Sequence, residues 1–113
     1  MSQSVSILAL TVEAAGALTA HRFVGANLSQ AGAGANAYGV ARTDAAIGES
    51  VAVDVLGTAI VEAGAAIAAG AEVEVNASGK AVTQSAGVAV GRLAPGESAQ
   101  ADGDLVEVIL FPN

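Results

Sequence analysis

Cysteine is absent from the sequence, and histidine occurs once, as His21. Without cysteine the chain can form neither a disulfide framework nor a thiolate-ligated metal site. One histidine cannot hold a metal ion unless further ligands come from elsewhere, so we expect no metal site and interpret His21 as a surface side chain. These two shortages exclude the disulfide-stapled and thiolate-metal classes of small protein.

Aromatic residues are also scarce, at 3% of a chain that is 53% hydrophobic. They are Phe23, Tyr38 and Phe111, so alanine and valine supply most of the apolar mass. Small side chains bury little area each, and a chain of this length buries only about two thirds of the surface that its unfolded state exposes. We therefore expect a thin core that a neighbouring subunit completes, which predicts an oligomer.

Basic residues are few as well, with four Lys and Arg against eleven Asp and Glu and a net charge of −7. Such a surface repels phosphate backbones, so we expect no nucleic-acid partner.

Long apolar runs are missing too. The alanine-rich segment 59–71 is interrupted by Glu62, Gly64 and Gly70, and the start of the chain lacks the basic residues of a signal peptide. We therefore expect no membrane partner.

Valine is what the chain has in abundance, and its spacing predicts the fold class. It alternates with other residues, as in a strand that buries one face, in four runs: 51–55, 73–75, 88–90 and 106–110. "VEVNASGKAVT", residues 73–83, predicts a hairpin whose short loop contains Gly79. We predict an all-β protein with at most one short helix, at Ala94–Ala101 or near Thr43–Ala46.

One phrase occurs twice, as "AAGALTAHRFVGA" at 14–26 and "AGAAIAAGAEVEV" at 63–75. "GVA" recurs at 39–41 and 87–89, and "GESVAVDV" has a later parallel in "GDLVEVIL". This recurrence predicts one small β-barrel or sandwich with an internal pseudo-twofold repeat. We divide the chain into an N-terminal arm or edge strand, 1–12, and a single β domain, 13–113, whose halves are about 14–57 and 63–111.

The repeated phrase has two interpretations. In the first it is a turn of small residues with one aliphatic anchor, so that Leu18 and Ile67 plug the core at equivalent places. In the second the alanines of 63–71 form a helix, because alanine has the highest helix propensity.

Catalytic motifs are missing. No serine lies in a G-x-S-x-G context, and the glycine-rich segment 31–39 has no P-loop lysine. The acidic residues lie on alternating strands or in turns, and the "DGD" at 102–104 lacks the further ligands of a calcium loop. We expect no catalytic residue, no cofactor and no enzyme activity.

Lys80 supports an alternative function. It follows a predicted hairpin turn in "SGKAV", and lipoyl and biotinyl carrier domains present a modified lysine at such a tip. Against this, Gly79 stands where the lipoyl motif usually has an acidic residue, and the Met-Lys-Met context of biotinyl domains is missing. A carrier domain modified at Lys80 remains one alternative, and a glycan-binding surface module is another, although few aromatic rings are available to stack on sugars.

The segments "HRFVGAN", "GVARTDAAIGESVAVDVLGTAIVEAGAAIAAGAEVEV" and "GKAVT…AGVAVGRL" resemble the capsid cement, or head decoration, proteins of tailed bacteriophages. The resemblance extends from about Thr11 to Leu110. It implies a small domain comparable to a β-tulip that forms homotrimers on the outer capsid surface of the virion, after synthesis in the host cytoplasm. There it would clamp neighbouring major capsid proteins. The family contributes no catalytic residues.

Two groups of residues are candidates for an interface. Arg22, Arg42 and Arg92 are three of four cations, and arginine is enriched among interface anchors because its planar fork holds a carboxylate with two hydrogen bonds. The alternative is that they only balance nearby carboxylates. Val5 and Ile7 lie in the uncharged, β-prone run "SVSILALTV", whose open edge we expect to pair with the sheet of a neighbour.

Overall fold

The computed structural model describes residues 5–111, which form eight β-strands and no helix. The strands are β1 (Ser6–Glu13), β2 (Phe23–Val24), β3 (Gly39–Ala41), β4 (Ser50–Glu62), β5 (Glu72–Val75), β6 (Ala81–Thr83), β7 (Gly91–Leu93) and β8 (Leu105–Leu110). The all-β prediction is therefore confirmed. Residues 1–4 of the predicted arm and 112–113 of the predicted domain lie outside the described residues.

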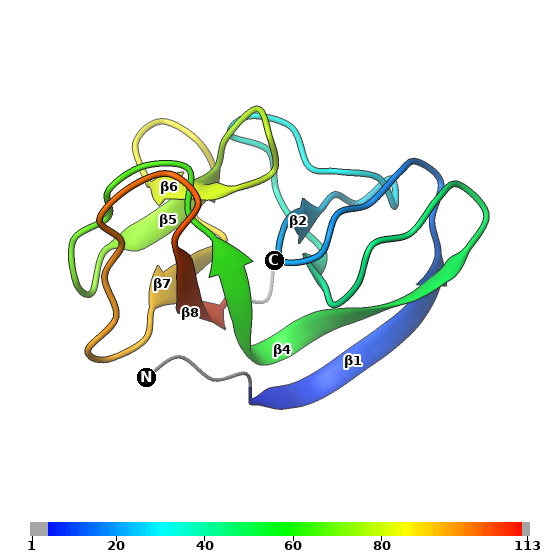
Figure 1. The fold of residues 1–113 in the computed structure, drawn as a ribbon, viewed down its shortest axis with the longest axis horizontal. Coiled ribbons are helices and arrows are strands. Elements are labelled where there is room, and N and C mark those ends of the chain that lie inside the picture. The colour runs from blue at the N-terminus through cyan, green and yellow to red at the C-terminus, as the bar shows by residue number, and fades with distance from the viewer. Residues whose placement is uncertain (1–4, 112–113) are drawn as a thin grey trace.

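All the strand pairs are antiparallel, and they form one curled, nearly closed sheet in the order β2-β3-β4-β8-β7-β5-β6, with β1 added at β4 (Figure 1). Strand β4 connects the two parts of the sheet, because its first half pairs with β1 and β3 and its second half with β8. Between these halves stands Gly57, with a φ of 97°. A Cβ there would lie 2.2 Å from the carbonyl oxygen of Val5, so the position requires glycine.

The core consists mainly of valine and alanine in two clusters. The larger contains Ile67 and Phe23, the one aromatic residue of either cluster, and the smaller contains Leu18. Leu18 and Ile67 are both buried, as predicted for core plugs. The core is thin because small side chains fill most of it.

No helix forms at 63–71, which corrects the second interpretation of the alanine-rich phrase. Ile67 instead makes an isolated antiparallel bridge to Ala99, with both N–H groups donating to the opposite carbonyl at 3.0 Å. Gly70 then takes a φ of 76°, outside the helical region. Burial of Ile67 and the turn at Gly70 override the helix propensity of alanine. Residues 5–111 accordingly contain no helix that could cross a bilayer.

The prediction of a strand at 88–90 is wrong, because no strand forms there. The hairpin predicted at 73–83 is confirmed as β5 and β6. Val88 is exposed and Val90 is buried, and the ladder begins only at Gly91. A Cβ on Gly91 would lie 2.5 Å from a methyl group of Val108, so the glycine lets β7 approach β8 closely. Ladder formation follows this close approach rather than the valine spacing.

Backbone partnerships recur along the chain in the same order. They are Val12↔Val51 and Val61↔Val106, Leu18↔Ala45 and Ile67↔Ala99, Val24↔Gly39 and Val73↔Gly91, and Ala41↔Val53 and Leu93↔Val108. In these registers β3 corresponds to β7, which corrects our match of 39–41 with 87–89. Strand β1 corresponds to the second half of β4. Our division into an arm and two halves stays a prediction, and the correspondence begins within the segment set apart as the arm or edge strand.

Candidate interaction surfaces

Val5 and strand β1 together present a run of exposed apolar side chains. Val5 is 53% exposed and Ile7 76%, and Leu8 and Leu10 are exposed as well. One edge of β1 pairs with β4, and the other edge has no partner among the described residues. An open edge of this length, uncharged as far as Val12, is a template for another strand.

Sequence reasoning selected Val5 and Ile7 and did not select Leu8 or Leu10, although all four lie in one run. An alternating strand normally hides every second side chain. Here both faces are exposed because β1 lies at the margin of the sheet, where Val12 is the residue that packs against the smaller core cluster. The complete absence of charge from Val5 to Val12 is the signal that identifies the whole run.

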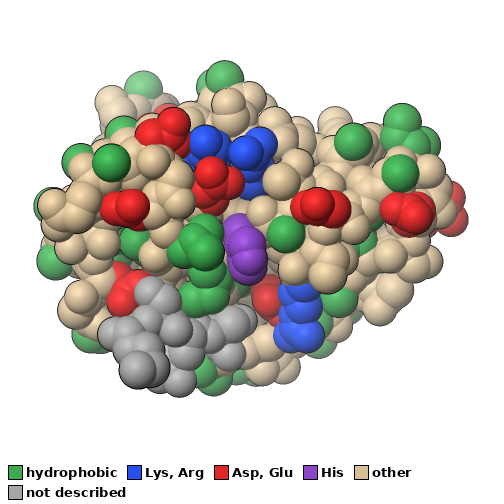
Figure 2. Space-filling model, viewed as in Figure 1, with side chains coloured by type: hydrophobic (Ala, Val, Ile, Leu, Met, Phe, Trp, Pro, Cys, Tyr) green, Lys and Arg blue, Asp and Glu red, His purple; other side chains and the backbone are tan. Residues whose placement is uncertain are grey.

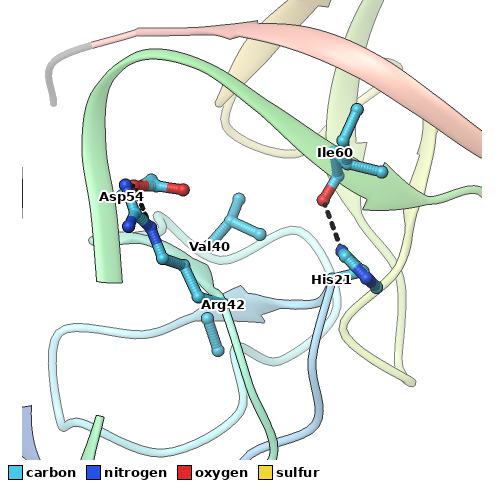
Figure 3. Close-up of a pocket in the computed structure, with 6 residues that line it drawn as sticks. His21, Val40, Arg42, Asp54 and Ile60 are labelled. Carbon is cyan, nitrogen blue, oxygen red and sulfur yellow. Dashed lines mark hydrogen bonds and ion pairs between the residues drawn. The ribbon is translucent and has the colours of Figure 1, made fainter. Parts of the chain in front are cut away.

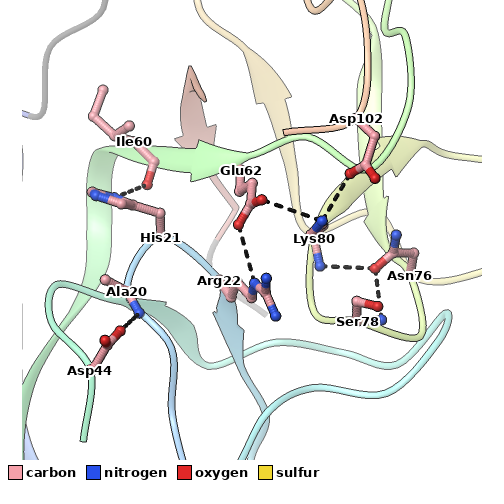
Figure 4. A network of polar contacts seen from close by, with 10 residues as sticks. All are labelled: Ala20, His21, Arg22, Asp44, Ile60, Glu62, Asn76, Ser78, Lys80 and Asp102. Carbon is pink, nitrogen blue, oxygen red and sulfur yellow. Dashed lines mark hydrogen bonds and ion pairs between the residues drawn. The ribbon is translucent and has the colours of Figure 1, made fainter. Parts of the chain in front are cut away.

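Glu62 is the centre of a network of opposite charges (Figure 4). Its Oε1 lies 3.2 Å from Nε of Arg22, and its Oε2 lies 3.3 Å from Nζ of Lys80. Lys80 also donates to Oδ1 of Asp102 at 2.8 Å. The network joins the segment before β2, the end of β4 and the hairpin between β5 and β6, so it ties the two parts of the sheet together.

Lys80 is therefore not presented as a carrier lysine would be. Its side chain is only 14% exposed, and its hydrogen bond to Asp102 raises the pKa of the ammonium while that bond lowers the pKa of the Asp102 carboxyl. A lysine held charged between two carboxylates is a poor nucleophile for attachment of a prosthetic group. The geometry argues against the carrier alternative.

Arg42 and Arg92 also have carboxylate partners within the chain. Arg42 donates to Oδ1 of the buried Asp54 at 2.8 Å, and this contact raises the pKa of the guanidinium. Arg92 lies 2.9 Å from the carboxylate of Glu72. Both arginine side chains remain about half exposed, whereas that of Arg22 is more covered. Arg42 and Arg92 thus retain donors for a second partner.

His21 borders an open cleft of about 360 Å³ beside the bend of β4 (Figure 3). The cleft is lined by His21, Val40, Ala41, Arg42, Asp54 and Ile60. His21 is half-buried and has a φ of 66°, and its Nδ1 lies 3.2 Å from the carbonyl oxygen of Ile60. On this face, both basic and acidic side chains lie around the histidine (Figure 2).

No group of three potential metal ligands exists within residues 5–111. Phe23 is buried, which leaves few rings among the described residues to stack on a sugar. The fold and its surface therefore define a class: a small all-β protein with a bare apolar strand edge and internally paired charges.

Comparison with known proteins identifies the family within this class. The family model of the phage cement proteins matches residues 2–110, so the chain belongs to the phage cement protein family. This confirms the resemblance found in the sequence and makes the chain a structural protein of a phage head.

Solved structures add a likeness of fold. The structure is similar to the base of the head fibre gp8.5 of bacteriophage phi29, with a TM-score of 0.73 and 23% sequence identity, over 94% of this chain and 95% of that chain. No curated protein sequence matches the chain.

Proposed function

We propose that this protein binds the outside of a phage head and stabilises the contacts between major capsid proteins, with no catalytic activity. Membership of the cement protein family carries the proposal, and the bare edge of β1 supports it. An exposed apolar strand edge is a typical site of pairing with another chain, and a partner that covers it prevents aggregation. The net charge of −7 suits an outer surface that faces away from packaged DNA.

The proposed partners are the major capsid protein and further copies of this chain, as a homotrimer. The valine- and alanine-rich core supports self-association, because a thin core gains stability when subunits bury additional apolar surface. Arg42 and Arg92 are the arginines best exposed for contact with a capsid carboxylate, and Arg22 is the least exposed of the three. Val5 and Ile7 are the apolar candidates.

Reconstitution of decorated heads tests this function. Heads that lack the protein are mixed with purified protein and imaged by electron microscopy, and their resistance to heat is compared before and after addition. We expect density on the outer surface, between neighbouring capsid subunits, and rupture at a higher temperature. Heads that acquire no density, or that acquire density without any gain in heat resistance, would contradict binding or stabilisation respectively.

A further inference from the structure

The first part of the chain covers the edge of the second half of β4. The N–H of Glu62 donates to the carbonyl oxygen of His21 at 2.8 Å, and the imidazole of His21 bonds the carbonyl oxygen of Ile60 (Figure 4). Ile60 and Glu62 are two residues apart, so their backbone groups point to the same side of the strand, away from β8. A turn centred on His21 therefore closes this edge.

Strand β1 is the counterpart of that half of β4. Thr11 and Glu13 precede Ile60 and Glu62 by one constant offset, and their antiparallel partners in β4 correspond to the partners of Ile60 and Glu62 in β8. The backbone groups of Thr11 and Glu13 therefore point away from β4. Among the described residues nothing bonds to that edge of β1.

The counterpart of the His21 turn is the segment Ala68–Gly70. Gly70 lies three residues after Ile67, as His21 does after Leu18, and the two have φ angles of 76° and 66°. Ala68, Ala69 and Gly70 are exposed. The carbonyl oxygen of Gly70 corresponds to that of His21, which accepts a hydrogen bond from the N–H of Glu62. No described residue donates a hydrogen bond to the Gly70 oxygen.

Within one molecule, the outer edge of β1 and the Ala68–Gly70 turn lie far apart. Figure 1 shows β1 running to the right-hand end of the ribbon, whereas the connection between β4 and β5 forms the left-hand end. The Ala68–Gly70 turn therefore cannot bond to the β1 edge of its own chain in the way that the His21 turn bonds to β4. A second copy can, because it brings the same turn on a separate molecule.

We infer that copies of this chain associate head to tail, with the Ala68–Gly70 turn of one copy bonded to the outer edge of β1 in the next. The carbonyl oxygen of Gly70 accepts from the N–H of Glu13, as that of His21 accepts from Glu62. Each copy presents one β1 edge and one Ala68–Gly70 turn, so the contact is heterologous and leaves no β1 edge open when a ring closes. Ile7 and Leu8 lie on the same strand and supply apolar surface to the contact.

This inference rests on the part of the proposed function that makes a second copy a partner, and it specifies the surfaces used. The absence of cysteine allows a direct test. Thr11→Cys protein is mixed with Ala69→Cys protein and treated with a short bismaleimide cross-linker. Thr83→Cys, an exposed threonine on the edge strand β6, replaces Thr11→Cys in the matched control.

We expect heterodimers of the Thr11→Cys and Ala69→Cys chains in excess over either homodimer, and a loss of this excess in the control. Predominance of Thr11→Cys homodimers would show a twofold pairing of β1 with β1 and overturn the inference. A yield equal to that of the control would overturn it as well.

A second variant checks the edge without a cross-linker. Thr11→Pro removes an N–H that does not serve the β1–β4 ladder, so the fold tolerates it while the contact between copies is lost. Thr11→Val keeps the N–H and is the matched control. Sedimentation should show the Thr11→Pro protein as monomer and the Thr11→Val protein as oligomer, and oligomers of both would contradict the inference. Protein that cross-links as expected but leaves heads undecorated overturns the proposed function alone.

Discussion

Truncation of Ile67 to alanine tests the assignment of the repeated phrase as an anchored turn. Ile67 is 2% exposed within the larger core cluster. The change removes three buried carbons, worth about 2.4 kcal/mol at roughly 0.8 kcal/mol for each CH₂. The cavity adds to this where the surroundings do not collapse, so the free energy of unfolding should fall by about 3–4 kcal/mol. For a domain of this size we expect the melting temperature to fall by roughly 12 °C or more.

Ile47→Ala is the matched control, because it makes the same chemical change at a residue that is 72% exposed. Its effect should be within about 0.5 kcal/mol of zero. Urea unfolding followed by circular dichroism measures both variants, with Leu18→Ala as the equivalent truncation in the smaller cluster. If Ile67→Ala is no less stable than Ile47→Ala, Ile67 does not anchor the core.

Three further perturbations test other contacts. Gly39→Ala places a Cβ 2.2 Å from a backbone oxygen of β4 and should destabilise the fold by about 1–3 kcal/mol or more in thermal unfolding, whereas Gly32→Ala, which meets no atom within 4 Å, should not. Arg42→Ala leaves a buried carboxylate unpaired and should lower stability more than Arg92→Ala, whose partner is exposed, and equal losses in urea would contradict this. Because its lysine partner lowers the pKa of Asp102, that carboxylate stabilises the fold above the ordinary carboxyl pKa, and the contribution is lost as pH falls through the lowered value. Asp102→Asn should therefore flatten the acid limb of the stability profile, and an unchanged limb would refute the pairing.

Local sequence patterns were sufficient to predict much of the fold. The alternation at 51–55 predicts part of β4, and the Gly79 turn predicts the β5–β6 hairpin, because both depend on neighbours in the sequence. The strand at 88–90 failed for the opposite reason. Its valines have the right spacing, but a ladder needs a partner at hydrogen-bonding distance, and the approach of β7 to β8 depends on Gly91, which carries no hydrophobic signal.

Of the candidate surfaces, the apolar edge could be predicted from the sequence and the charge pairing could not. The lack of charge at the start of the chain identified an apolar edge containing Val5 and Ile7, since composition is local. The pairing of Arg22 with Glu62 joins residues 40 positions apart, and no spacing rule predicts it. Such pairs depend on how β4 bends at Gly57 and brings distant segments together.

The sequence by itself determined the class of the protein: strands from alternating valines, a thin core from the lack of aromatic residues, and no thiolate chemistry from the lack of cysteine. Only the tertiary structure decided which edge stays open. His21 and Gly70 occupy corresponding turns, yet His21 meets the edge of β4 while Gly70 remains exposed. Hydrogen bonds between segments distant in sequence exist only once the chain has folded, so the surroundings of the two corresponding turns decide which one bonds to a strand edge.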